Sequence, residues 1–115
     1  MKLFAILLAS LTVSFSAVAA DAAKGEQALK KNQCASCHGD NYSKSVDNSI
    51  PKLAGQHQDY LVQALRQYKN GDNKNSLAGR NNAIMLGQAK KLSDADIDNI
   101  AAYLANLKGE LAVRK

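Results

Sequence analysis

The segment Cys34-Ala35-Ser36-Cys37-His38 constrains this chain more than any other feature. Two cysteines three positions apart, followed at once by a histidine, form the pattern to which a c-type haem is attached. On one turn of helix, positions i, i+3 and i+4 lie on one face. Two thiols on that face can reach two vinyl groups at one porphyrin edge, and the imidazole can then bind the iron. The segment therefore predicts thioethers at Cys34 and Cys37, the chain's only cysteines, and an axial ligand at His38.

The N-terminus has the pattern of a secretory signal peptide. Lys2 precedes a nearly unbroken apolar stretch from 3 to 13, and small residues surround a cleavage site before Asp21. The stretch is shorter than the roughly 20 residues of a membrane span. We therefore expect residues 1–20 to be a cleaved signal peptide, and residues 21–115 to form one monohaem domain in the bacterial periplasm without an integral membrane segment. An uncleaved anchor is the alternative.

The predicted domain is poor in residues that can build a core. From residue 21 onward, Leu, Ile and Val supply only 17 of 95 residues, and both Phe lie in the first 20. So small an apolar fraction, below about 20%, is typical of disordered chains. A buried porphyrin would supply the missing apolar surface, and we expect the haem-free chain to be unfolded or molten. The formal net charge of +5 is modest, and we expect no nucleic-acid partner.

Apolar residues recur at helical spacing in three segments, and no segment alternates as a strand. The first runs from 21 to 32 with Asp21 as its cap, and the second from 58 to 70 with Gly71 at a left-handed cap. The third begins at a capping box of Ser93 and Asp96. The fold class is therefore predicted to be all-α, with three to five short helices wrapped around one covalently attached haem.

Two polar loops, 39–56 and 71–82, separate these helices. A short apolar island, residues 83–86, follows the second loop. The first loop is long enough to fold beneath His38, and it contains Pro51, the only proline. A ligating imidazole needs an acceptor for its second nitrogen, and the Pro51 carbonyl is a plausible one.

The sixth position of the iron has two candidate ligands after residue 20. Met85 lies on the apolar island, and a thioether suits haem iron and raises its reduction potential. His57 follows Pro51 closely, which favours a surface position on the proximal side. We predict that Met85 and His38 are the axial ligands. Tyr60 and Tyr68 are expected near the haem or in the core, and Arg80 either at a propionate or at the surface.

With these residues in place, the chain resembles the class I c-type cytochromes, in particular small bacterial monohaem members and each half of the dihaem ones. The motifs that carry the resemblance span residues 25–104. They are Gly25 to Leu29, Cys-Ala-Ser-Cys-His-Gly at 34–39, Ile-Pro-Lys-Leu-Ala-Gly-Gln at 50–56, Tyr60 to Gly71, Met85 and Leu92 to Leu104. The resemblance implies haem c with iron held by Cys34, Cys37, His38 and Met85. It also implies a His38–Pro51 contact and a crossing of the first and last helices at Gly25.

The predicted function is the transfer of single electrons between respiratory redox partners, such as an oxidase, reductase or dehydrogenase. Protein ligands would fill both axial positions, so we expect no enzymatic activity, a monomer, and brief docking that exposed lysines steer. The alternative is a haem-based sensor of small ligands or a peroxidase-like enzyme, if Met85 is labile. A third possibility needs no haem: a redox thiol pair, or zinc held by Cys34, Cys37, His38 and His57.

Overall fold

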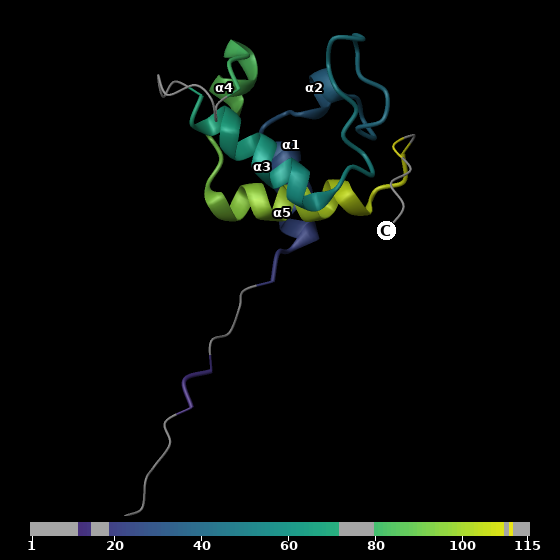
Figure 1. Cartoon of the computed structure of the whole chain (residues 1–115). Helices are drawn as coiled ribbons and strands as arrows, with labels where there is room; N and C mark the ends of the chain where they lie inside the picture. The colour runs from purple at the N-terminus through teal and green to yellow at the C-terminus, as the bar shows by residue number, and fades with distance from the viewer. Residues whose placement is uncertain (1–11, 15–18, 72–79, 110, 112–115) are drawn as a thin grey trace, which may run out of the picture.

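The computed structural model describes residues 12–14, 19–71, 80–109 and 111. These residues form helices and loops but no strand, which confirms the all-α prediction (Figure 1). Most of the predicted signal peptide, at 1–11 and 15–18, lies outside the described residues. Five helices are present in the described part: α1 (Ala22–Lys31), α2 (Ala35–His38), α3 (Gln58–Lys69), α4 (Ala83–Ala89) and α5 (Asp94–Asn106).

Side-chain caps begin the first and last helices, as the sequence predicts. The Asp21 carboxylate accepts hydrogen bonds from the backbone N–H of Ala23 at 3.0 Å and of Lys24 at 3.2 Å. At the start of α5, the Ser93 hydroxyl accepts from the Asp96 N–H, and the Asp96 carboxylate accepts from the Ser93 N–H, both at 3.0 Å. These bonds pair N–H groups that have no partner within the helix.

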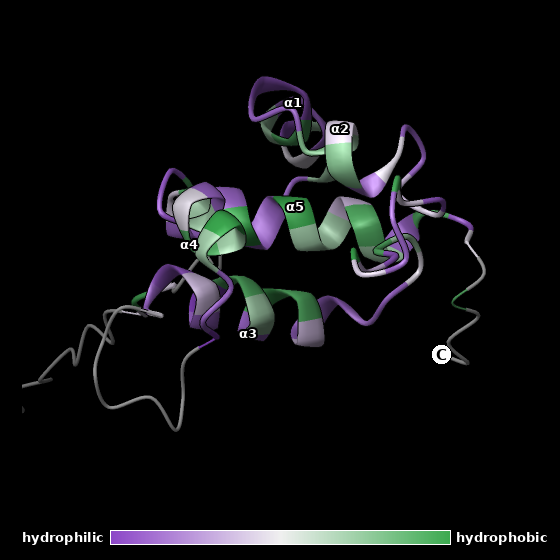
Figure 2. Cartoon of the chain, turned by 90° about the horizontal axis from the view of Figure 1, so that it is seen from above, coloured by the Kyte–Doolittle hydropathy of each residue, from purple (hydrophilic) through white to green (hydrophobic). Residues whose placement is uncertain are grey.

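The core lies where α5 packs on α1 and α3. Figure 2 shows the apolar faces of α3 and α5 turned toward each other. The buried side chains here come from all three helices, and the larger ones are Leu29, Leu61, Ile97, Ile100 and Leu104. The predicted crossing of the first and last helices is confirmed, because Gly25 lies directly against the α5 backbone.

Two local predictions differ from the structure. Gly71 does not adopt a left-handed conformation; it is needed because a Cβ there would lie 2.2 Å from the carbonyl oxygen of Arg80. The apolar island is a helix, α4, because the Asn82 side chain accepts a hydrogen bond from the Met85 N–H at 3.1 Å and caps it. Among the described residues, no helix has the length and apolarity that a membrane span requires.

Candidate haem site

The two cysteines lie on one helical turn. Cys34 precedes α2, and its carbonyl accepts hydrogen bonds from the N–H of Cys37 at 3.3 Å and of His38 at 3.1 Å. This turn places the two thiols and the imidazole on neighbouring positions of one face. Both thiols are free of disulfides. Cys34 is half-buried against the core and Cys37 is exposed.

His38 is held by a backbone carbonyl. Its side chain is buried, and its ring Nδ1 lies 2.9 Å from the Pro51 oxygen. A carbonyl can only accept a hydrogen bond, so Nδ1 must carry a proton, and in the neutral imidazole Nε2 is then the nitrogen with the free lone pair. The predicted contact between Pro51 and His38 is therefore present, and it prepares Nε2 to bind a metal.

Backbone contacts that the sequence did not reveal hold the Pro51 loop in place. The buried residue Tyr42 adopts a φ of 58°, which is uncommon for a residue with a side chain. Its carbonyl accepts from the N–H of Leu53 at 2.8 Å and of Ala54 at 3.0 Å, and the next N–H, of Gly55, donates to Leu104 at 2.9 Å. The loop is thus fixed both to the segment after α2 and to the end of α5. No sequence signal marks Tyr42 for this role.

The predicted sixth ligand, Met85, lies on α4 and is half-buried. In Figure 1, α4 and α2 lie on the same side of the pair formed by α3 and α5. Since α4 packs on α3, Met85 belongs to an element with its own support in the fold. Met85 is thus supported through the packing of α4 on α3, whereas His38 is supported through its contact with Pro51 and through Ala35 of α2, which packs against the core.

Arg80 lies beside two tyrosine rings of α3. Its guanidinium carbon is 5.6 Å from the ring centroid of Tyr60 and 5.5 Å from that of Tyr68. It also donates to the Tyr60 hydroxyl and to Gln67 Oε1, each at 3.1 Å. The bond to the Tyr60 hydroxyl is the main cause that raises the pKa of Arg80. Arg80 is thus half-buried and packed on α3, a few residues before α4 begins.

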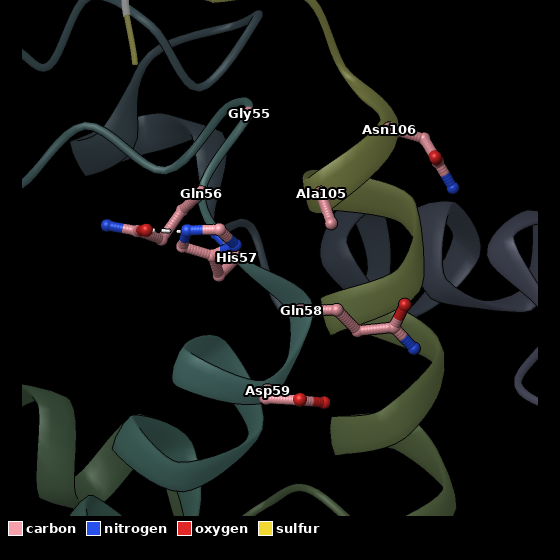
Figure 3. A pocket seen from close by; sticks show the side chains of 7 residues that line it. All are labelled: Gly55, Gln56, His57, Gln58, Asp59, Ala105 and Asn106. Carbon is pink, nitrogen blue, oxygen red and sulfur yellow. Dashed lines mark hydrogen bonds between the residues drawn. The ribbon is translucent and has the colours of Figure 1, made fainter. Parts of the chain in front are cut away.

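His57 lies away from the core, at the start of α3. It is exposed, and it lines a pocket of about 310 Å³ between α3 and the end of α5 (Figure 3). Its backbone N–H donates to the Gln56 side chain at 2.9 Å. Among the residues that the structure describes, no three His, Cys, Asp or Glu side chains gather to hold a metal ion. The zinc alternative is therefore wrong for the described part of the chain.

The donors in this site fit a covalently bound haem. Burial raises the pKa of the Cys34 thiol, so the free thiol favours its protonated form. Two unpaired thiols on one turn can form thioethers, and His38 offers an oriented nitrogen. Met85 adds a soft sulfur on a second element.

Comparison with known proteins decides the family. The sequence profile of the cytochrome c family, described as "Cytochrome c", matches residues 22–108. This chain belongs to the cytochrome c family. The cytochrome is 40% identical over 94 residues to cytochrome c-554(547) of Halothiobacillus neapolitanus, which covers 78% of this chain and all of that protein. As a family member it is an electron-transfer protein with covalently attached haem c and iron.

A second group of relatives is longer. The cytochrome is 35% identical over 112 residues to cytochrome c4 of Stutzerimonas stutzeri, covering 96% of this chain and 52% of that protein. The crystal structure of reduced recombinant cytochrome c4 from Pseudomonas stutzeri superposes with a TM-score of 0.69 at 36% identity, over 80% of this chain and 48% of that one. The chain thus spans about half the length of the c4 relatives, and the cytochrome c fold is confirmed.

Proposed function

We propose that this cytochrome is a periplasmic carrier of single electrons, with one haem c attached through Cys34 and Cys37 and ligated by His38 and Met85. The observation that carries the proposal is the 2.9 Å contact between His38 Nδ1 and the Pro51 carbonyl. This contact occupies Nδ1, so Nε2 is the ring nitrogen left to bind the iron, and the contact fixes the orientation of the ring.

The proposed ligand set suits electron transfer more than catalysis. When bound, the haem supplies one-electron redox chemistry at its iron, and Met/His ligation raises the potential of that couple. The chain holds the two axial side chains on separate elements, His38 on α2 through its contact with Pro51 and Met85 on α4, which packs on α3, so neither ligand needs to move when an electron arrives or leaves. With both positions filled by protein, no open coordination site remains for a substrate, and we propose no enzymatic activity.

We further propose that docking with redox partners is transient and that the protein acts as a monomer. Short-lived redox complexes bury little surface, typically below about 1,200 Å². Five exposed lysines could steer an acidic partner toward the protein. They are Lys30, Lys31, Lys52, Lys90 and Lys91. The full sequence has a formal net charge of +5, to which Lys2 of the predicted signal peptide contributes one charge.

An absorption spectrum of protein exported from a haem-attaching host tests the ligand assignment. We expect covalent haem and the weak red band of methionine-ligated ferric haem. Met85 is the only methionine after residue 20, so Met85→Ala should abolish the red band. Two control variants should keep the band: Ile84→Ala, at an exposed neighbour on the same helix, and His57→Ala, at the rival ligand.

Two results would overturn the proposal. A red band that persists in Met85→Ala would remove Met85 from the ligand set. Strong carbon monoxide binding by the reduced wild type at neutral pH would show a labile sixth position and favour a sensor or an enzyme.

A further inference from the structure

The Pro51 carbonyl accepts two hydrogen bonds, and only one of them comes from His38. The hydroxyl of Ser45 donates to the same oxygen at 3.2 Å, while His38 Nδ1 lies at 2.9 Å. Nothing in the spacing of the sequence marks Ser45, which lies in the polar loop seven residues after the histidine. Two donors that share one acceptor compete for its electron density.

Ser45 is held in this position by its neighbours on both sides. The N–H of Val46 donates to the Cys37 carbonyl at 3.0 Å. On the other side, the Lys44 carbonyl lies so close to Gly39 that a Cβ on Gly39 would be 2.0 Å from its oxygen. Gly39 has a φ of 89°, so it also needs the conformational freedom of glycine. The backbone around Ser45 is therefore clamped against the end of α2.

We propose that Ser45 is a positioning residue that sets the reduction potential of the haem by sharing the Pro51 carbonyl with His38. This inference rests on the proposed function, because it requires His38 to be the iron ligand. A strong bond from Nδ1–H to the carbonyl makes the imidazole a more basic ligand, which stabilises the oxidised form. The Ser45 hydroxyl withdraws part of the carbonyl's acceptor strength, weakens that bond and raises the potential.

The test compares reduction potentials of haem-loaded variants. Ser45→Ala should shift the one-electron equilibrium about threefold toward the oxidised form, a fall of roughly 28 mV at about 59 mV per tenfold change. Ser45→Thr keeps the hydroxyl and should stay at the wild-type potential. Ser49→Ala is the matched control, since Ser49 is in the same loop but its hydroxyl bonds to Asp47 and not to Pro51.

A second readout follows the hydrogen bond itself. In the reduced protein, the His38 Nδ1 proton should exchange with solvent more slowly in Ser45→Ala than in the wild type, because its bond to Pro51 is stronger. If Ser45→Ala loses its haem, Ser45→Gly provides a second hydroxyl-free variant for both measurements.

The outcomes separate the two proposals. Covalent haem and a normal red band, with an unchanged potential in Ser45→Ala, would overturn the role of Ser45 and leave the electron carrier standing. A potential that falls equally in Ser49→Ala would also overturn it, because the effect would then not depend on the shared carbonyl. A wild type without covalent haem would overturn the proposed function and this inference together.

Discussion

Gly25 of α1 lies against Asn99 of α5 with no room for a side chain between them. A Cβ on Gly25 would be 2.0 Å from the Asn99 carbonyl oxygen and 2.9 Å from the next backbone nitrogen, that of Ile100. The same two helices are joined where the Asp21 N–H donates to the Asn99 side chain at 2.7 Å. The crossing therefore depends on backbone contact, which a side chain at position 25 would prevent.

Gly25→Ala should destabilise the protein even though alanine is the better helix former. The gain in helix propensity is about 1 kcal/mol, but the alanine methyl group has to displace backbone atoms of α5. We expect a net loss of roughly 1–3 kcal/mol in the free energy of unfolding, measured by denaturant titration of the haem-loaded protein.

The same substitution at Gly87 provides the control. Gly87 lies on α4, and a Cβ there meets nothing within 4 Å. Gly87→Ala should leave the stability unchanged or raise it by up to about 1 kcal/mol. Equal effects of the two substitutions would contradict the packing account of Gly25.

Arg80→Lys should weaken the attachment of α4 to α3. Lysine keeps the charge, but it cannot donate to Tyr60 and Gln67 in the fork geometry of the guanidinium, and it stacks less well between two rings. We expect a loss of about 1–2 kcal/mol in the free energy of unfolding. Thermal unfolding followed by circular dichroism would measure it.

Arg66→Lys is the matched control for this prediction. Arg66 is exposed and forms an ion pair with Asp98 at 3.3 Å. Exposed pairs contribute little, so the change should cost at most about 0.5 kcal/mol. If Arg66→Lys lowered the free energy of unfolding as much as Arg80→Lys, the tyrosine contacts of Arg80 would not be the cause of its effect.

Asp47 should titrate below its ordinary range. The Ser49 hydroxyl and then the Ser49 backbone N–H donate to its carboxylate and lower its pKa. Because the pKa of Asp47 is lower in the folded protein than in the unfolded chain, these hydrogen bonds stabilise the turn at pH values above the unfolded-state pKa. That stabilisation is lost as the pH falls through the pKa of the folded protein. Ser49→Ala should move the Asp47 pKa back toward its ordinary value.

NMR titration of the Asp47 side-chain carboxyl would follow this shift. Ser43→Ala serves as the control, because the Ser43 hydroxyl bonds to Asn41 and not to Asp47. An Asp47 pKa that does not move in Ser49→Ala would mean that the serine hydroxyl is not its cause.

Haem-free protein should lack a cooperative unfolding transition. Among the described residues, the buried side chains larger than alanine in the hydrophobic core are few for a domain of this length: Leu29, Tyr42, Leu61, Leu92, Ile97, Ile100 and Leu104. Far-UV circular dichroism of a Cys34→Ser/Cys37→Ser variant, compared with the haem-loaded wild type, tests this. A cooperative, native-like melt of the haem-free chain would show that the protein side chains suffice.

The amino-acid sequence by itself determined the features that depend on neighbours along the chain. The spacing of Cys34, Cys37 and His38 is a property of one helical turn, and the capping box of Ser93 and Asp96 is complete within four residues. Helical periodicity predicted α1, α3 and α5 to within a few residues, because each turns apolar residues at helical spacing toward the core. The resemblance to class I cytochromes added the expected contact between His38 and Pro51 and the crossing at Gly25.

Only the tertiary structure decided which distant groups meet. Gly71 appears in the sequence as a helix cap, but it is required by the approach of Arg80. The island around Met85 is a helix, because a side chain at Asn82 caps it. Ser45 shares the Pro51 carbonyl because backbone contacts to Cys37 and Gly39 bring its loop there. Such contacts join residues that have no periodic relation, so their energy depends on the folded path of the chain and leaves no local pattern in the sequence.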